Sequence, residues 1–510
     1  MNGASTTMPL QQVFAGMDLV VPDVSVTDIT SNSHDAVERG LFLACSGGAR
    51  HGLDFLSEAL EIGVRAVAWE PEDGIHAPNL PPEVVGICVT GLRARLGVIA
   101  DRFFSAPSNT VAVTGVTGTN GKTTTAYFVA QALNRIGLKA AYMGTLGYGI
   151  DSNLQPSALT TPDCITLHRR LRELADAGAQ YVITEVSSHA LDQHRVDGVR
   201  FQVAALTNLS RDHLDYHGSM KKYAETKARL FAGNGIHTAV LNVGDRFGAE
   251  MAGCLNPASD LISVAVVDTD TDAPDARLRG RIVGERTDGI GLLLFGDFGE
   301  ALLESTLWGR FNAENLAMAV GILLANGVSF AAAVAALKDV VTPPGRMQII
   351  RSKDAKPTVV VDFAHTPDAL GQALKTMRRH TSGKVWCVFG CGGNRDQGKR
   401  HMMGEIAATF ADQVIVTDDN PRDEDPGEIT AQVCVGVKEN GHCEIIHDRK
   451  TAIETAIAGA APDDVVLIAG KGHELVQVSG AAALPFSDTA VARAALGLMS
   501  PDLALQGRAE

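Results

Sequence analysis

The chain has 510 residues, which is too long for a single hydrophobic core and predicts about three domains. Hydrophobic residues make up 45% of the chain, and the net charge of -15 argues against a nucleic-acid partner. The chain does not open with a basic segment followed by an apolar one, and no run of about 18 apolar residues occurs. We therefore expect a cytoplasmic protein without membrane insertion.

Two stretches rich in proline, glycine and small polar residues, at 105–109 and 342–345, predict domain boundaries. The predicted domains are 1–106, 107–342 and 343–510. In the last two, short β-branched runs alternate with helical patterns, which predicts parallel sheets flanked by helices. The predicted strands lie at 181–186, 201–209, 238–243, 358–364, 385–390, 413–417 and 465–469. The region 277–308, with short apolar runs separated by glycines, predicts a small antiparallel insert.

A glycine-rich loop joins an apolar run at 111–113 to a helical pattern from 123 to about 136. Glycines let backbone N–H groups approach phosphate oxygens, and the start of a helix adds a partial positive charge. Lys122 supplies a cation, and the hydroxyl of Thr123 can bind Mg2+. The sequence therefore predicts a nucleoside triphosphate site formed by Gly118, Thr119, Asn120, Gly121, Lys122, Thr123 and Thr124.

Polar residues follow the later predicted strands, at the ends where doubly wound sheets bind their ligands. Glu185, which closes a strand expected beside the loop strand, is a candidate Mg2+ ligand. His213 is a weaker candidate, because a lone histidine is more often hydrogen-bonded for structural reasons. Lys227, taken by itself, is typical of an exposed lysine on a helix.

The last predicted domain also carries polar residues after its strands. Asp362 and His365 follow one of them, and Thr366 with Pro367 is typical of the first residues of a helix. Thr366 thus has a structural explanation, whereas Asp362 and His365 remain candidates for a site.

Charged residues of both signs occupy the next loops of this domain. Positive charge gathers at Arg395, Lys399 and Arg400, which in an acidic protein indicates a carboxylate or phosphate partner. Arg422 can pair with a carboxylate, whereas Asp419 and Glu474 can accept from an ammonium group. Opposite charges on separate loops suit a zwitterionic amino acid; a surface salt-bridge network is the competing interpretation.

Together these motifs resemble those of the Mur ligases, ATP-dependent amide-forming enzymes of peptidoglycan precursor synthesis. The resemblance is carried, in order, by residues 118–124, 185–189, 207–218, 227–231, 312–315, 344–346, 362–368 and 470–474. Within the family, Asp419-Asn420-Pro421-Arg422 resembles the motif of members that add meso-diaminopimelate to UDP-N-acetylmuramoyl-L-alanyl-D-glutamate. A lysine-adding member and a folylpolyglutamate synthetase-like ligase are the alternatives, and a nucleotide-dependent switch is the alternative of a different class.

The resemblance implies an α/β protein of three domains. It implies a smaller N-terminal α/β domain that binds the UDP-substrate, a central P-loop ATPase-type domain with a mostly parallel sheet and flanking helices, and a C-terminal Rossmann-like domain that binds the amino acid. It also implies ATP and Mg2+ as cofactors, UDP-N-acetylmuramoyl-L-alanyl-D-glutamate and meso-diaminopimelate as substrates, an acyl-phosphate intermediate and a monomer.

Residue roles also follow from the resemblance. It implies that Lys227 is carboxylated by CO2 and that the resulting carbamate helps to hold Mg2+ with Thr123, Glu185 and His213. It implies catalytic roles for Lys122, Lys227 and His213, and ATP contacts from Asn312, Arg346 and Asp362. It implies contacts to the UDP-substrate from Ser31, Thr160, Thr161, Ser187, Gln193 and Arg195. Contacts to diaminopimelate are implied for Arg395, Asp419, Asn420, Pro421, Arg422, Gly470 and Glu474.

The chain departs from the family pattern in its first domain. Thr30-Ser31-Asn32 stands where members usually have Asp-Ser-Arg, so Ser31 is retained as a uridine-side contact and an arginine contact is not expected there. Leu159 precedes Thr160 where some relatives have asparagine, which removes one side-chain hydrogen bond to the substrate.

Overall fold

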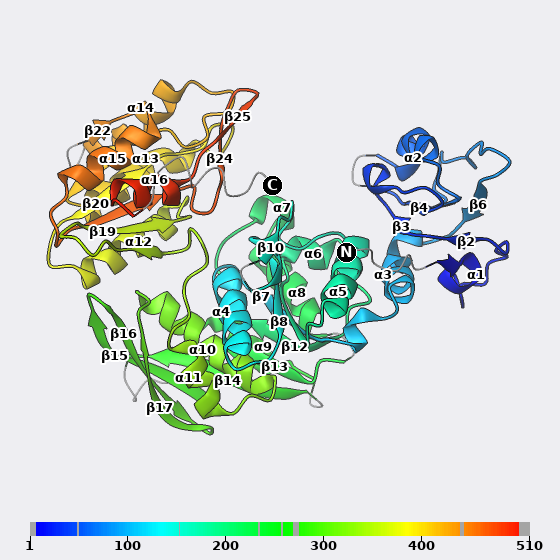
Figure 1. The fold of residues 1–510 in the computed structure, drawn as a ribbon, viewed down its shortest axis with the longest axis horizontal. Coiled ribbons are helices and arrows are strands. Elements are labelled where there is room, and N and C mark those ends of the chain that lie inside the picture. The colour runs from blue at the N-terminus through cyan, green and yellow to red at the C-terminus, as the bar shows by residue number, and fades with distance from the viewer. Residues whose placement is uncertain are drawn as a thin grey trace. The chain divides into compact units, whose positions relative to one another are not determined.

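The computed structural model describes residues 7–47, 50–151, 153–232, 235–256, 259–268, 275–438 and 443–498 (Figure 1). The chain divides into two compact units. The first comprises Met1–Val264 with Gly321–Val328, and the second comprises Ala265–Val320 with Ser329–Glu510. Among the described residues, no helix has the length and apolar character needed to cross a membrane.

The first unit begins with a four-stranded parallel sheet in the order β3-β4-β5-β6. Alternate residues of β4 pack on opposite faces, Leu43 with helix α3 and Phe42 with helix α2, so both faces are covered. The elements here are β1 (Met8–Pro9), α1 (Leu10–Val13), β2 (Ser25–Val26), β3 (Ile29–Thr30), β4 (Leu41–Ala44), α2 (Leu56–Ile62), β5 (Ala66–Trp69), β6 (Val85–Cys88) and α3 (Leu92–Phe103).

A larger sheet follows, in the order β10-β9-β8-β11-β7-β12-β13-β14. Strands β8 to β14 in this order are parallel, whereas β9 and β10 form an antiparallel edge that the sequence analysis did not predict. Its strands are β7 (Ala112–Thr117), β8 (Ala140–Gly144), β9 (Gly147–Ile150), β10 (Asn153–Gln155), β11 (Tyr181–Glu185), β12 (Phe201–Leu206), β13 (Thr238–Asn242) and β14 (Asp260–Val267). The helices are α4 (Lys122–Arg135), α5 (Cys164–Asp176), α6 (Ser188–Asp192), α7 (Leu214–His217), α8 (Met220–Ala228) and α9 (Arg246–Ala252).

Strand β7 is longer than the apolar run at 111–113 that predicted it. Thr114 and Gly115, which are not apolar, follow this run. Strand β11 nevertheless pairs with β7 as far as Val116, and β12 pairs with it on the other side as far as Thr117. Hydrogen bonding to two neighbours thus extends the strand beyond the sequence signal.

In the second unit, the insert predicted at 277–308 is an antiparallel meander, so this prediction is confirmed. It consists of β15 (Leu278–Arg286), β16 (Gly289–Gly296) and β17 (Gly299–Ser305), and the helices α10 (Arg310–Ala325) and α11 (Phe330–Leu337) follow it.

The second unit also contains a six-stranded sheet in the order β18-β19-β23-β20-β21-β22, parallel except for β18. Leu467 packs with helices α12 to α14, whereas Val466 and Ile468 pack with α15 and α16 on the other face. The strands are β18 (Gln348–Ile350), β19 (Thr358–Asp362), β20 (Val385–Phe389), β21 (Gln413–Val416), β22 (Cys443–Ile445), β23 (Val465–Ala469) and the hairpin β24 (Val476–Ser479) with β25 (Ala482–Pro485). The helices are α12 (Pro367–His380), α13 (Gly398–Phe410), α14 (Pro426–Lys438), α15 (Arg449–Gly459) and α16 (Asp488–Ala495).

The predicted α/β fold with parallel sheets and flanking helices is therefore confirmed. Thr366 caps α12 by accepting from the N–H of Ala369, and Pro367 is the first residue of that helix, as predicted. Strand β19 ends two residues before the predicted end at 364, because the carboxylate of Asp362 accepts the N–H of Ala364 and turns the chain.

Candidate functional site

The predicted phosphate loop connects β7, an interior strand, to α4. Gly118 has a φ of 145°, and a Cβ at this residue would lie 1.9 Å from the Thr207 hydroxyl oxygen, so only glycine fits. The ammonium of Lys122 donates to the carbonyl oxygens of Gly118 and Thr119, at 2.9 and 2.8 Å. The first turn of a helix has N–H groups without intrahelical acceptors, so the loop and α4 can bind an anion.

A second loop, which follows β12, is hydrogen-bonded along the phosphate loop. The backbone carbonyl of Asn208 accepts from the N–H of Thr119, and its side-chain oxygen accepts from the N–H of Asn120, both at 2.9 Å. The hydroxyl of Thr119 accepts from the N–H of Ser210 at 3.0 Å. These bonds hold the phosphate loop in place, and Asn208 is a residue that the sequence analysis missed.

Glu185 ends β11, which pairs with β7 as predicted, and its side chain is completely buried. Its carboxylate accepts hydrogen bonds from the hydroxyls of Thr123, at 2.8 Å, and Tyr142, and from the N–H of Thr145 at 2.9 Å. Mg2+ prefers oxygen ligands and is commonly bound by one or two carboxylates together with substrate phosphates. The oxygens of Thr123 and Glu185 fit that ion.

No group of three or more His, Cys, Asp or Glu side chains that could hold a metal occurs in the part of the chain that the structure describes. Such a group is typical of sites built by protein ligands alone, such as a zinc site. The oxygen donors beside the phosphate loop are instead typical of a metal that binds together with a nucleotide.

Lys227 lies at the end of α8 with only 1% of its surface exposed. Its ammonium nitrogen lies 2.9 Å from the carbonyl oxygen of Gly118, to which it donates, and 4.7 Å from the centre of the Tyr223 ring. Burial, followed by the charge of Lys122, holds the pKa of Lys227 well below its usual value. The interpretation as an exposed helix lysine is therefore wrong, and the lowered pKa shifts this lysine toward its neutral form, which is the nucleophilic one.

His213 is exposed on the loop after β12 and has a φ of 51°, which is uncommon for a residue other than glycine. Its ring centre lies 4.9 Å from that of His189, and its Nε2 lies 3.4 Å from a carboxylate oxygen of Asp212. No hydrogen bond between described residues joins His213 to Thr123 or Glu185. The structure thus brings Thr123 and Glu185 into direct contact, whereas the described side-chain contacts of His213 are with Asp212, His189 and Tyr223.

Most residues predicted to contact the UDP-substrate are hydrogen-bonded around the end of β11: Thr160, Thr161, Ser187, Gln193 and Arg195. The hydroxyl of Thr161 donates to the carbonyl of Glu185 at 2.8 Å and accepts from the N–H of Ser187 at 3.1 Å. Arg195 donates to the carbonyl of Thr161 at 3.1 Å. Ser31, the remaining predicted contact, directly follows β3.

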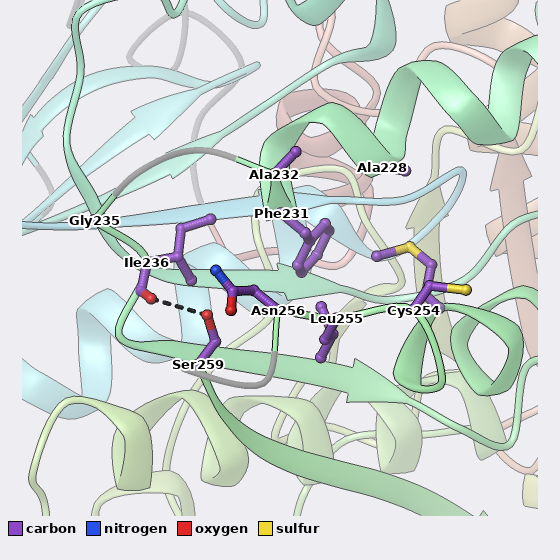
Figure 2. A pocket seen from close by; sticks show the side chains of 10 residues that line it. Ala228, Phe231, Ala232, Gly235, Ile236, Cys254, Leu255, Asn256 and Ser259 are labelled. Carbon is purple, nitrogen blue, oxygen red and sulfur yellow. Dashed lines mark hydrogen bonds between the residues drawn. The ribbon is translucent and has the colours of Figure 1, made fainter.

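A pocket of about 560 Å³ lies where β13 and β14 begin, close to the end of α8 (Figure 2). Its lining residues are Ala228, Phe231, Ala232, Gly235, Ile236, Met251, Cys254, Leu255, Asn256 and Ser259. None of them is a predicted site residue, and the predicted site lies where the strands end. We therefore assign this pocket no part in the chemistry.

The ATP contacts predicted in the second unit are Asn312, Arg346 and Asp362. Asn312 is buried in α10 and donates to the carbonyl of Trp308 at 2.9 Å, and the guanidinium of Arg346 lies 4.4 Å from the centre of the Phe363 ring. The two carboxylate oxygens of Asp362 accept backbone N–H groups of Met347 and Ala364, at 2.7 and 2.8 Å. Burial raises the pKa of Asp362, and its position shows that it holds the backbone beside Arg346.

Three cations follow β20, and the structure separates their roles. Arg400 is completely buried, and its guanidinium pairs with Glu424 at 2.9 Å and donates to the carbonyl of Gly392 at 3.3 Å. The prediction that Arg400 offers charge to a ligand is therefore wrong, because Glu424 neutralises it. Lys399 donates to the carbonyl of His365 at 2.8 Å, whereas the Arg395 side chain is exposed.

The loop Asp419-Asn420-Pro421-Arg422, after β21, contacts the loops that follow β20 and β23. Arg422 has a φ of 53° and donates to the carbonyl of Gly393 at 2.7 Å. Gly470 has a φ of 113°, and a Cβ there would lie 2.6 Å from Oδ2 of Asp419, so these two loops touch. The amide of Asn420 donates to Glu474 at 2.8 Å. The structure thus brings together residues of these loops that were predicted to bind the amino-acid substrate.

Two buried cations below these loops were missed as parts of the site. Arg449 forms an ion pair with Asp488 at 2.7 Å, both side chains fully buried, and donates to the carbonyl of Ala469 at 2.9 Å. Lys471 donates to Glu474 at 2.8 Å. Lys471 belongs to the motif at 470–474, but lysine and arginine are mostly exposed residues, so the sequence carried no signal of their burial.

Two family models match the chain: the Mur ligase middle domain at residues 116–323, and the Mur ligase glutamate ligase domain at residues 345–472. The chain is 44% identical over 496 residues to the UDP-N-acetylmuramoyl-L-alanyl-D-glutamate–2,6-diaminopimelate ligase of Xylella fastidiosa, covering 97% of this chain and 98% of that protein. It is 43% identical over 489 residues to the protein of the same name from Pseudomonas aeruginosa, covering 96% and 98%.

A solved structure of a protein with that name is 34% identical, with a TM-score of 0.70, and the match covers 96% of this chain and 99% of that one. A D-alanyl-D-alanyl-adding ligase from Acinetobacter baumannii, at 16% identity and a TM-score of 0.66 over 92% and 97% of the two chains, shares the fold. The phosphate loop, the buried lysine and the charged loops after β20, β21 and β23 all lie within these matches. The chain therefore belongs to the Mur ligase family of ATP-dependent, amide-forming ligases.

Proposed function

We propose that this chain uses ATP to join meso-diaminopimelate to UDP-N-acetylmuramoyl-L-alanyl-D-glutamate. The observation that carries the proposal is the group of opposite charges on the three loops after β20, β21 and β23. Arg395 and Arg422 can bind carboxylates, and Glu474 can accept from an ammonium group. Such an arrangement suits an amino acid that carries both charges, and 44% identity to a named diaminopimelate ligase supports the choice of substrate.

The first step of the proposed reaction belongs to the phosphate loop. The peptide carboxylate attacks the γ-phosphorus of ATP, which gives an acyl phosphate and ADP. Lys122 would turn from the carbonyls of Gly118 and Thr119 to the phosphate oxygens, and Thr123 and Glu185 would hold Mg2+. When bound, Mg2+ offsets negative charge on the transferring phosphoryl group.

In the second step the neutral amine of diaminopimelate attacks the acyl carbon, phosphate leaves, and the amine loses its proton as the amide forms. The carboxylates of the site and His213, a predicted metal ligand and catalytic residue, are the candidate bases, and the ring of His213 is exposed after β12. We further propose that Lys227 carries a carbamate that helps to hold Mg2+. The buried amine with a lowered pKa supports this, because a neutral amine is the form that adds CO2.

The remaining contacts belong to the same proposal. Residues 1–106 would bind the uridine side of the substrate through Ser31, residues 107–342 would bind ATP, and residues 343–510 would bind the amino acid. Asn312, Arg346 and Asp362 are the further proposed ATP contacts, with Asp362 acting through the backbone beside Arg346. The proposal also includes the cytoplasmic location and the monomeric state that the sequence analysis predicted.

Phosphate release from ATP tests the function directly. The enzyme, Mg2+ and UDP-N-acetylmuramoyl-L-alanyl-D-glutamate are mixed with diaminopimelate, lysine or glutamate in turn. We expect release with diaminopimelate and at least about tenfold less with lysine, which lacks the second carboxylate that an arginine can bind. Release with lysine but not diaminopimelate would reassign the substrate, release with glutamate would favour a folylpolyglutamate synthetase-like ligase, and release without any amine would contradict amide formation.

A further inference from the structure

Lys471 is a completely buried lysine on the loop that follows β23. Its ammonium donates to Oδ1 of Asn420 at 2.9 Å and to Oε2 of Glu474 at 2.8 Å. A buried ammonium group is destabilising unless acceptors compensate for its lost hydration. Here a carboxylate and an amide oxygen compensate for it, and both belong to residues proposed to bind the amino acid.

Asn420 connects Lys471 to the hairpin formed by β24 and β25. Besides the ammonium, its Oδ1 accepts the backbone N–H of Val478 in β24 at 2.9 Å, and its Nδ2 donates to Oε2 of Glu474 at 2.8 Å. An amide oxygen has two lone pairs, so Oδ1 is fully used. Asn420 is therefore held by its neighbours in the fold and in turn holds Glu474.

Only one of the two carboxylate oxygens of Glu474 accepts hydrogen bonds from described residues. Its Oε2 accepts from both Lys471 and Asn420, whereas Oε1 receives no hydrogen bond from any residue in the described part of the chain. The Glu474 side chain is 33% exposed to solvent. A carboxylate fixed through one oxygen presents the other in a defined direction, which is what an ammonium ligand requires.

We propose that Lys471 is a positioning residue for the incoming amino acid. By holding Oε2 of Glu474 and Oδ1 of Asn420, it directs Oε1 of Glu474 toward the ammonium group of the amino acid and balances the charge of the carboxylate. The proposal rests on the proposed function, because it requires an amino acid bound at Glu474.

The electrostatics of the loop agree with this geometry. Burial alone would raise the pKa of Glu474, but the hydrogen bond and charge of Lys471 hold that pKa below its usual value. For the neighbouring carboxyl group of Asp419, burial outweighs the charges of Arg449 and Lys471 and raises the pKa. Lys471 thus keeps Glu474 in the ionised form, which accepts from an ammonium group most strongly.

Lys471→Met tests the proposal in the intact enzyme. We expect the KM for diaminopimelate to rise at least about tenfold, since a hydrogen bond to a charged group is lost, while the KM values for ATP and the UDP-dipeptide change less than about twofold. Lys450→Met is the matched control: Lys450 is a half-exposed lysine of the same unit, paired with Glu454 at 4.0 Å. A Lys471→Met enzyme with an unchanged KM for diaminopimelate, or with all three KM values raised alike, would overturn the proposal.

A double-mutant cycle separates positioning from a purely structural role. If Lys471 acts through Glu474, then Lys471→Met should change the KM for diaminopimelate by less than about twofold when Glu474→Gln is already present. The double variant also removes the uncompensated carboxylate, so it remains testable if Lys471→Met alone fails to fold. Equal effects of Lys471→Met in both backgrounds would contradict the proposal. Absence of diaminopimelate-dependent phosphate release from the unaltered enzyme would instead contradict the proposed function.

Discussion

Lys122 and Lys227 donate to the same atom, the carbonyl oxygen of Gly118, each at 2.9 Å. Two ammonium groups this close repel one another, and Lys227 is enclosed by Tyr223 and the phosphate loop. The cost of charging is therefore greater for Lys227, which explains why its pKa falls well below the usual value. The same enclosure should make the ammonium form of this lysine unfavourable for folding.

Lys227→Met is expected to give a more stable but much less active enzyme at about pH 7. The unfolded chain keeps a proton on Lys227 up to the usual pKa of 10.5, whereas the folded chain loses it at lower pH. The unfolded state binds more protons between these pKa values, so the stability of the unaltered protein rises with pH there. The advantage of Lys227→Met in urea unfolding should shrink as the pH rises toward 10.5.

The same variant should lose about 100-fold or more in the rate of phosphate release, since a group placed at the phosphate loop is removed. Lys221→Met is the control, because Lys221 lies on the same helix with 86% of its side chain exposed. A Lys227→Met enzyme that keeps its activity would exclude a role for this amine in the reaction.

At the scale of elements, the site is built where parallel strands end. The carboxyl ends of β20, β21 and β23 lie at one edge of the sheet, so the loops after them meet, and the close approach of Gly470 to Asp419 is one example. Strands buried on both faces hold these loops rigidly, because Leu467 and Ile468 of β23 pack into different cores. Small changes at the loops should therefore affect amino-acid binding more than nucleotide binding.

Gly470→Ala tests this view. A Cβ at this residue would lie 2.6 Å from Oδ2 of Asp419 at a φ of 113°, so both the backbone and the neighbouring loop must shift. We expect a loss of stability of about 1–3 kcal/mol and a KM for diaminopimelate raised about tenfold, with the KM for ATP unchanged. The control Ser329→Ala removes the N-cap of α11 and should cost about 1 kcal/mol without changing either KM. Equal KM changes in the two variants would contradict a local effect.

At the scale of the whole molecule, the two compact units carry different chemistry. The phosphate loop with Lys227 belongs to the first unit, and the loops with Arg395, Arg422 and Glu474 belong to the second. With a net charge of -15, the protein repels anionic substrates at long range, so binding must depend on these local cations. The nucleotide should therefore protect the loop at 118–124, whereas the amino acid should protect the loops at 419–422 and 470–474.

Hydrogen exchange measured by mass spectrometry should show this separation. A non-hydrolysable ATP analogue with Mg2+ should slow exchange at 118–124, and diaminopimelate added afterwards with the UDP-dipeptide should slow exchange at 419–422 and 470–474. Lys122→Met should remove the first effect, since it removes the cation of the phosphate loop. Protection of 118–124 by diaminopimelate alone would contradict the assignment of ligands.

The sequence by itself determined the features that depend on near neighbours in the chain. The phosphate loop, the cap of α12 by Thr366 and the antiparallel meander at β15–β17 were all predicted, because turn residues, caps and apolar periodicity act over a few residues. The Mur ligase motifs, which are also short, predicted the family correctly.

Only the tertiary structure decided which charged side chains are exposed. Lys227 and Gly118 are 109 residues apart in the chain, and Lys471 and Asn420 are 51 residues apart, so no local sequence pattern predicts these contacts. Arg395 and Arg400 look alike in the sequence, yet one is exposed and the other is neutralised by Glu424. The physical reason is that burial and charge compensation depend on segments that meet only after folding.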